Sequence, residues 1–352
     1  MNQTGQDAHA LNLSHITLGL DRHTLKTQVH AASSPAFLVK QALKKVNQGI
    51  DEAFWQKAPI EACLKKRADI VEEVLLLGWE WAGLENKDLM LTAVGGFGRK
   101  RLHPFSDVDI LILSNTPLTP SQNVALEKWI AYVWDTGLAL GHSVRTMDEC
   151  REMAKRDITV FSNLLDAAPI TPHPLFKSLT RFLFEESKTL IPLERFFELK
   201  QLERQKRYEK FGHTEYTLEP NLKESPGGLR DLQLLGLLTK RAFGTDDLNA
   251  LETMGFLTHE EKESLHQAQH YLSTIRYALH LIAKGREERL YLDYQEKLAR
   301  LYGFDQKSVN QAISAFMKYI FRALNECREM TSLLFQHFRE LYVSLNHMPP
   351  VP

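Results

Sequence analysis

The sequence predicts an α+β protein, in which helices flank a core with a small mixed sheet and a helical domain follows. Two short runs rich in aliphatic and β-branched residues, Leu89–Val94 and Asp107–Leu113, predict buried strands. Apolar residues at steps of three and four predict helices on both sides of these strands. The longest of these apolar stripes consists of Leu265, Leu272, Ile275, Leu279 and Ile282.

The expected elements divide the chain into four segments. A polar segment at 1–33 lacks periodicity and is expected to form a loosely held arm, and a helical segment covers 34–85. The α+β core is expected at 86–172, and a helical domain at 173–345. The other elements expected in the core are a helix at Asn123–Trp134, a strand at Gly141–Arg145, a helix at Asp157–Leu164 and a strand at about Leu165–Ile170.

Composition and charge indicate an ordinary soluble globular protein. Hydrophobic residues make up 43% of the 352 residues and charged residues 25%, which is enough apolar material for two or three domain cores. The formal net charge is −1, so the chain as a whole has no bias toward nucleic acid or a membrane surface. No nucleic-acid or membrane partner is therefore expected.

Cysteine usage points to a reducing compartment. Cys63, Cys150 and Cys327 lie far apart and do not have the spacing of metal ligands. The start of the chain lacks the basic-then-apolar pattern of a signal peptide, and no apolar run reaches the roughly 18–20 residues needed to span a bilayer. We therefore expect a cytoplasmic protein.

Two carboxylates stand two residues apart in the second expected strand. Asp107 and Asp109 should project from one face, since side chains at i and i+2 of a strand share a face. Like charges so placed repel each other unless a cation lies between them. Mg²⁺ suits that position because it takes oxygen ligands and shares them with substrate phosphates, and Mn²⁺ is an alternative. The pair therefore predicts a metal site.

A glycine turn precedes this pair. Without Cβ atoms, Gly95 and Gly96 allow the backbone to approach a triphosphate and to donate hydrogen bonds to its oxygens. Arg99 can add a charged contact to the same phosphates. The predicted chemistry is in-line attack on the α-phosphorus, with metal stabilising the attacking and leaving oxygens. Two-metal sites usually use a third carboxylate, for which Asp166 in the last expected strand is the candidate.

Each of these features has an ordinary structural explanation when taken alone. Glycines often close strand-to-helix turns, and Asp-x-Asp is common on solvated strand edges. A glycine pair followed eleven residues later by Asp-Val-Asp in a strand is a more specific signal. Two other phosphate motifs are excluded, because Arg101 stands where a dinucleotide fingerprint needs its third glycine and no Lys-Ser/Thr pair completes a P-loop after these glycines.

The segment Ala93–Leu113, AVGGFGRKRLHPFSDVDILIL, resembles the signature of the DNA polymerase beta-type nucleotidyltransferase superfamily. Within that superfamily it is most similar to the nucleotidyltransferase part, at the N-terminus, of the bacterial protein-PII uridylyltransferases, and GHSVRT at 141–146 also matches them. Further matches are the glycine-containing loop at 217–233, TLEPNLKESPGGLRDLQ, and the segment at 275–303. The resemblance extends from about Leu89 to Phe338.

This resemblance implies a Mg²⁺-dependent enzyme that transfers UMP from UTP to a tyrosine hydroxyl of a PII-type signalling protein and releases pyrophosphate. It implies metal binding and catalysis by Asp107, Asp109 and Asp166, with Asp166 also a candidate base for a hydroxyl whose pKa is near 10. The helical domain would cover the nucleotide and present the acceptor. The expected nucleotide-binding residues are Gly95, Gly96, Arg99, Ser106, Lys223 and Arg230.

The chain departs from the family pattern in three respects. Members are usually longer and include a phosphohydrolase domain of the HD type, but none of the fourteen histidines here is followed by Asp, so uridylyl-removing activity is not expected. The Asp-Ala-Arg pattern common after the third acid reads Asp166-Ala167-Ala168, which removes one basic contact. Lys100-Arg101 adds charge where the family more often has Gly-Glu. The last two departures leave the nucleotide and acceptor preferences open.

The charged flanks of the glycine loop admit two interpretations. Lys223, Glu224 and Arg230 either face the nucleotide or the acceptor, or are structural charges that cap neighbouring helices. The same choice applies to a basic set farther along the chain, which forms either a wall near the triphosphate or a solvated face. That set comprises Arg276, His280, Arg286 and Arg289.

Two other functions remain open at this stage. The same core could use a different nucleotide or acceptor, as in AMP transfer, and an assay of all four triphosphates would separate these. A non-catalytic regulator that binds nucleotide or a partner protein is the alternative from another class. The intact pair of Asp107 and Asp109 argues against it, because a binding module has little use for two adjacent repelling carboxylates.

Overall fold

A computed structural model describes most of the chain. The described residues are 13, 35–85, 87–212, 217–304 and 308–346. The polar arm expected at 1–33 lies outside them except for Leu13, which is buried.

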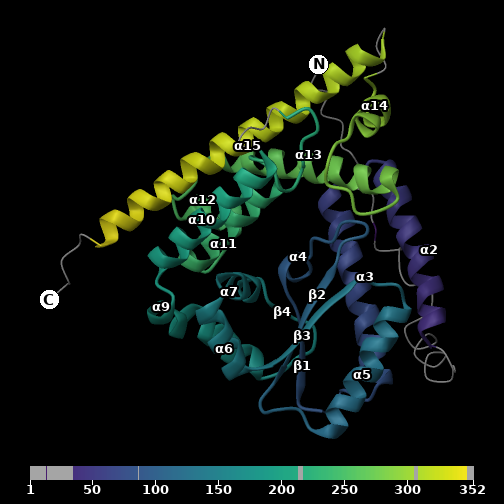
Figure 1. Cartoon of the computed structure of the whole chain (residues 1–352), viewed down its shortest axis with the longest axis vertical. Helices are drawn as coiled ribbons and strands as arrows, with labels where there is room; N and C mark the ends of the chain where they lie inside the picture. The colour runs from purple at the N-terminus through teal and green to yellow at the C-terminus, as the bar shows by residue number, and fades with distance from the viewer. Residues whose placement is uncertain (1–12, 14–34, 86, 213–216, 305–307, 347–352) are drawn as a thin grey trace. The chain divides into compact units, whose positions relative to one another are not determined.

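Contacts divide the chain into two compact units, whose elements are labelled in Figure 1. Unit 1 comprises Met1–Arg151 and Asp166–Leu179, and unit 2 comprises Glu152–Leu165 and Thr180–Pro352. The helices expected at 34–85 therefore share a unit with the sheet. The segment Glu152–Leu165, expected in the core, joins the helical unit because the helix that it contains packs against another helix there.

A four-stranded mixed sheet in the order β3-β2-β1-β4 lies in unit 1 (Figure 1). Its strands are β1 (Leu89–Ala93), β2 (Val108–Ser114), β3 (Leu140–Thr146) and β4 (Ala168–Pro169). β1 runs antiparallel to β2 and β4, whereas β2 and β3 are parallel. Every residue of β1 and all but one of β2 are buried. The prediction of a small mixed sheet with buried strands is confirmed.

Two strand predictions need correction. β2 begins at Val108, so Asp107 lies directly before the strand and not in it. β4 contains only Ala168 and Pro169, although the sequence predicts a longer strand. Asp166 lies in a turn, and Pro169 has no N–H to donate to a neighbouring strand, which limits the pairing.

Three long helices of unit 1 pack together beside the sheet (Figure 1). They are α2 (Pro35–Trp55), α3 (Ile60–Trp81) and α5 (Pro120–Asp135), and a shorter helix, α6 (Met147–Arg156), begins in this unit. The buried Trp129 indole of α5 donates a hydrogen bond to the Leu75 carbonyl of α3 (3.1 Å). Thr119 and Gln122 form a capping box, so α5 begins a few residues before the expected Asn123.

Unit 2 is a helical unit. Its helices are α7 (Ile158–Leu165), α10 (Leu193–Phe211), α11 (Leu229–Phe243), α12 (Leu248–Thr253), α13 (His259–Ala283), α14 (Leu292–Leu301) and α15 (Val309–Asn346), and α8 (Leu175–Arg181) leads through a π-helical turn at Phe182–Glu186 into α9 (Ser187–Leu190). The predicted bundle helix is α13, which begins at a capping box of Thr258 and Glu261. It ends at Lys284, which adopts a left-handed conformation with φ of 52°. Among the helices in the described ranges, none is both long and apolar enough to cross a membrane.

Candidate functional site

Asp109 lies where the first three strands approach the glycine turn of unit 1. It is the one exposed residue of β2, and its carbonyl accepts a hydrogen bond from the Val94 N–H (3.0 Å). A Cβ on Gly141 would clash with one oxygen of its carboxylate, and a Cβ on Gly95 would lie 3.8 Å from the other. The contact at Gly95 is an ordinary one, so Gly141 of β3 is the glycine that makes room for this carboxylate.

Asp107 lies directly before the first residue of β2 and is also exposed. A turn at Pro104–Phe105, in which Phe105 has a left-handed φ of 59°, leads the chain into this position. Ser106, directly before Asp107, is half-buried. Two solvent-exposed carboxylates next to each other suit a hard divalent cation that keeps water and substrate ligands. The residues present therefore fit a Mg²⁺ ion held by Asp107 and Asp109.

The predicted glycine turn folds as a single helical turn, α4 (Gly95–Gly98). Gly95 has a φ of 56°, a left-handed conformation that glycine adopts without the steric cost of a Cβ. The first N–H groups of a helical turn have no partner within it, so those of Gly95 and Gly96 suit an anionic ligand. The structure thus places the glycine pair and Asp109 together.

Asp166 contacts the same helical turn from the turn that precedes β4. Its side chain is only 4% exposed and forms an ion pair with Arg99. Its carbonyl lies so close to Gly98 that a Cβ there would clash with it. Within the described residues, no group of three or more acidic, histidine or cysteine side chains is arranged to hold a metal ion. The three predicted acids are therefore not a preformed set of metal ligands, because the Arg99 guanidinium neutralises Asp166.

Lys100, one of the departures from the family pattern, has a structural role. It has a left-handed φ of 57°, and its ammonium forms ion pairs with Glu72 and Asp69 of α3. Burial acts to lower the pKa of Lys100, but these two carboxylates raise it above its ordinary value. Its charge is therefore compensated by α3 and does not add to the charge facing the Asp107 and Asp109 pair.

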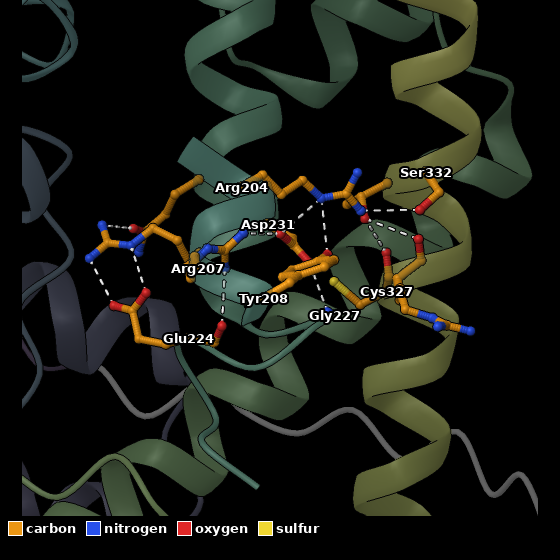
Figure 2. A network of polar contacts seen from close by, with 12 residues as sticks. Arg204, Arg207, Tyr208, Glu224, Gly227, Asp231, Cys327 and Ser332 are labelled. Carbon is orange, nitrogen blue, oxygen red and sulfur yellow. Dashed lines mark hydrogen bonds and ion pairs between the residues drawn. The ribbon is translucent and has the colours of Figure 1, made fainter. Parts of the chain in front are cut away.

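A buried carboxylate anchors the glycine-containing loop of unit 2, as Figure 2 shows. Asp231, in the first turn of α11, accepts hydrogen bonds from the Tyr208 hydroxyl (2.5 Å) and the Gly227 N–H (2.7 Å). It also forms an ion pair with Arg207, and Arg204 lies 3.5 Å away. These contacts fix the loop to α10. This role of Asp231 was not predicted, because the sequence signals it only by an acid in the first turn after the glycines.

The glycines of this loop are required by packing within unit 2. Gly227 has a φ of 75°, and a Cβ on it would clash with the Leu324 carbonyl of α15. A Cβ on Gly228 would lie 2.7 Å from the Lys223 carbonyl, which is closer than real Cβ atoms approach an oxygen. Packing within unit 2 is therefore enough to explain why glycine occupies positions 227 and 228, and no bound ligand is needed for this explanation.

The two basic residues predicted to bind nucleotide from this loop differ in their surroundings. Arg230 donates hydrogen bonds to Glu224 (3.0 and 3.4 Å) and to Gln233 (2.8 Å). Lys223 is half-buried, and the described part of the chain offers its ammonium no hydrogen bond or ion pair. Burial, helped by the charges of Arg230 and Arg276, lowers the pKa of Lys223 to about 8.

The basic set farther along the chain is not uniform. Arg276 is 6% exposed and donates two hydrogen bonds to Glu288 (2.6 and 2.5 Å), and His280 is fully buried. Arg286 Nε lies 3.8 Å from Glu288, and Arg289 is exposed. The interpretation as one solvated face is therefore wrong for Arg276 and His280, because the Glu288 carboxylate draws Arg276 inward.

Comparison with known proteins gives a match in each unit. Residues 80–160 match the model of the nucleotidyltransferase domain, and residues 195–335 match the model described as GlnD PII-uridylyltransferase. Each model covers less than half of the chain. The first match contains Asp107 and Asp109, and the second contains the glycine-containing loop and Asp231.

Curated relatives match almost the whole chain. The bifunctional uridylyltransferase/uridylyl-removing enzyme of Pseudomonas fluorescens is 36% identical over 335 residues, which cover 94% of this chain and 37% of the relative. Enzymes of the same name from Pseudomonas aeruginosa and Pseudomonas entomophila are 37% identical over 91% and 92% of this chain, respectively. The chain spans little more than a third of the length of these relatives.

Proposed function

This chain is a relative of the PII-uridylyltransferases with a nucleotidyltransferase domain, and we propose that it transfers UMP from UTP to a tyrosine of a PII-type signalling protein. The tyrosine oxygen forms a bond to the α-phosphorus of UTP. The bond from that phosphorus to the β-phosphate oxygen breaks, and pyrophosphate leaves.

The setting of Asp109 carries this proposal. Its carboxylate lies between Gly95 and Gly141, two residues after Asp107 and beside the helical turn that suits phosphate oxygens. A solvated acid on a strand edge does not need a glycine on the neighbouring strand to make room for it, as Gly141 does for Asp109. This packing favours a carboxylate with a fixed position, as a metal ligand requires.

The metal and the nearby residues have separate roles in the proposed site. Mg²⁺ held by Asp107 and Asp109 would neutralise charge on the phosphates and on the attacking oxygen. The backbone of Gly95 and Gly96 binds phosphate oxygens, and Ser106 adds a hydroxyl donor at the entrance to β2.

Arg99 and Asp166 act as a pair in the proposed reaction. Arg99 supplies positive charge for the phosphates and holds Asp166 through their ion pair. Asp166 accepts the proton of the acceptor hydroxyl or becomes a third metal ligand when Arg99 turns to the nucleotide. Lys223 and Arg230 of unit 2 are the remaining candidates for nucleotide binding.

The second candidate function is the same chemistry with another nucleotide or acceptor. Ala168 stands where the family more often has Arg, and in the structure it pairs with Ala93 in the sheet. Ala168 has no charge that could contribute to the selection of a nucleotide. The third candidate is a regulator that binds nucleotide or partner without turnover.

The test is an incubation of the protein with Mg²⁺, labelled UTP and a purified PII-type protein, followed by intact-mass analysis of the acceptor. We expect a mass increase of one UMP, lost in the Asp107→Asn and Asp109→Asn variants. The loss should exceed the ~100-fold cost of replacing a group that only supports a metal ligand. Because each variant removes one of two repelling charges, the stability of the metal-free protein should stay the same or rise.

Other outcomes separate the candidates. Modification by another triphosphate or of another acceptor would replace the uridylyl assignment with the second candidate. Nucleotide binding without turnover, with any of the four triphosphates, would favour the regulator. Near-normal turnover in either aspartate variant would contradict the metal site.

A further inference from the structure

Lys223 is a charged group that forms no ion pair with the described residues of unit 2. Its backbone N–H donates to the Asn221 side chain (3.0 Å), but within the described residues its ammonium has no hydrogen bond or ion pair. The side chain is half-buried. Buried charges in proteins are normally paired or bound to a ligand, because an unpaired charge loses hydration without compensation.

The surroundings of Lys223 hold it in place. The Lys223 carbonyl accepts a hydrogen bond from the Arg230 N–H (2.9 Å) at the start of α11. The N–H of the preceding residue, Leu222, donates to the Glu288 carbonyl (2.8 Å). The loop before α11 is thus joined by backbone bonds to α11 and to the segment that follows α13. These hydrogen bonds hold the backbone that carries Lys223.

The charges facing Lys223 do not neutralise it. The two nearby carboxylates are Glu224 and Glu288, and each is engaged by a guanidinium: Glu224 by Arg230, and Glu288 by Arg276 through two hydrogen bonds. Burial would raise the pKa of Glu288, but Arg276 and His280 hold it well below its usual value, so this carboxylate stays ionised. The cluster formed by Lys223, Arg230, Arg276, Glu224 and Glu288 therefore carries excess positive charge.

We propose that Lys223, supported by Arg230 and Arg276, binds a phosphate-class anion in unit 2. An ammonium with three donors and two neighbouring guanidiniums match the several oxygens and negative charges of a phosphate or pyrophosphate group. Such an anion forms an ion pair with the Lys223 ammonium, which no group of the described residues does. The proposal extends the proposed function, since UTP contains this group and its transfer releases pyrophosphate, but the anion site exists in unit 2 whether or not transfer takes place.

The ligand can be the phosphates of a nucleoside triphosphate or free pyrophosphate, and titration of the full chain separates them. Isothermal titration in metal-free buffer with EDTA, at pH 7, uses sodium pyrophosphate, UTP and uridine as separate probes. Without divalent cation, the Asp107 and Asp109 pair repels phosphates and does not contribute. Equal binding of pyrophosphate and UTP shows that the phosphates alone are recognised, and tighter binding of UTP shows that the nucleoside also contributes.

Two variants and a matched control test the role of Lys223. In Lys223→Met, the dissociation constant for pyrophosphate should rise about tenfold or more, since a hydrogen bond to a charged group contributes at least that factor. Lys206→Met should bind like the wild type, because Lys206 is an exposed lysine of α10. A thermal melt of each variant checks that it is folded. Equal binding by Lys223→Met and the wild type, or no binding of pyrophosphate and UTP by the wild type, would overturn the proposal.

The pH dependence of binding adds a signature that a structural lysine would lack. Because the pKa of free Lys223 is about 8, the affinity of the wild type for pyrophosphate should fall relative to that of Lys223→Arg as pH rises from 7 to 9.5, and this ratio cancels the titration of pyrophosphate itself. Lys223→Arg keeps its charge over this range and should retain its affinity at pH 9.5. Asp107→Asn, which should abolish transfer, should still bind pyrophosphate. Clearly tighter binding by this variant than by the wild type would show that the anion lies near the Asp107 and Asp109 pair, and it would reject the site in unit 2 without rejecting the proposed function.

Discussion

Gly141 shapes the candidate metal site through the side chain that it lacks. A Cβ at this position would occupy the space of one Asp109 carboxylate oxygen. Nothing in a lone Gly-His dipeptide of an expected strand reveals this, because the contact joins two strands that are about thirty residues apart in sequence. The role of Gly141 therefore depends on the parallel pairing of β2 and β3.

We predict that Gly141→Ala lowers uridylyl transfer by about a hundredfold, the usual cost of displacing a catalytic group by about 1 Å. The added methyl group should turn the Asp109 carboxylate away from its position while the strand pairing persists. Gly285→Ala is the matched control, because its Cβ would make only an ordinary contact (3.9 Å). The measurement is the initial rate of acceptor labelling, and a wild-type rate in Gly141→Ala would contradict the fixed position of Asp109.

Lys100 balances backbone strain against an ion pair. Its left-handed φ costs roughly 1–2 kcal/mol relative to glycine, whereas a partly exposed ion pair contributes about 0.2–1 kcal/mol. Lys100→Gly removes both terms, and Lys100→Met removes only the ion pair with Glu72 and Asp69. We predict that urea denaturation finds the Gly variant more stable than the Met variant and within about 1 kcal/mol of the wild type. If Lys100→Gly were less stable than the wild type by more than about 1 kcal/mol, the ion pair would contribute more to stability than the backbone strain costs.

Among the elements, the loop before α11 depends on tertiary contacts more than on its own sequence. Gly227 lies against the backbone of α15, and Asp231 binds groups from α10 and from the loop itself. A buried carboxylate with two guanidiniums and a hydroxyl is expensive to disturb, because removing its charge leaves the partners buried and unpaired. The conformation of the loop is thus fixed by residues that are distant in sequence.

We predict that Asp231→Asn lowers the free energy of unfolding by about 3 kcal/mol or more, as for other broken buried ion pairs. The uncompensated groups would be Arg204 and Arg207. The control is Glu326→Gln, which breaks the exposed pair with Arg322 in α15 and should cost less than about 0.5 kcal/mol. Similar costs for the two variants in urea denaturation would mean that the Asp231 network contributes little.

Helix ends were more predictable than strand ends. α13 begins at Thr258, whose capping box with Glu261 is a signal within four residues of sequence. β4 instead consists of two residues that pair with the end of β1, and its length follows from the turn at Asp166 and from Pro169. Local signals specify a helix because its hydrogen bonds are local, whereas a strand end depends on a partner elsewhere in the chain.

For the whole molecule, Lys223 links global stability to pH. Its pKa is about 8 in the folded protein, below the value of 10.5 of an unperturbed lysine that we assign to the unfolded chain. Between these values the unfolded chain binds the extra proton, so the free energy of unfolding rises with pH across this window. Below pH 8 Lys223 is protonated in both the folded and the unfolded protein, so the free energy of unfolding is reduced by the full cost of burying this charge.

We predict that Lys223→Met is more stable than the wild type at pH 7, because it removes this charge, and that its advantage shrinks as pH rises from 8 to 10. The comparison uses urea denaturation of both proteins at each pH, so that other titrating groups cancel. Lys206→Met, which alters an exposed lysine, should show no such trend. A difference between wild type and Lys223→Met that is independent of pH would contradict the depressed pKa.

The sequence by itself determined the fold class, the buried strands, the superfamily and the carboxylate pair of Asp107 and Asp109. These depend on patterns within about twenty residues, such as alternation of apolar residues or the spacing of glycines and acids. The curated relatives and the two family models agree with the assignment to the superfamily.

Only the tertiary structure decided which charges are compensated. Lys100 is neutralised by α3, Asp166 by Arg99, and Arg276 by Glu288, while Lys223 keeps an ammonium without a partner among the described residues. A charged residue looks the same in sequence whether it is solvated, paired or buried. Its state depends on the dielectric surroundings and on neighbours brought by packing from elsewhere in the chain, so the sequence left Lys223 and Arg276 with two interpretations each.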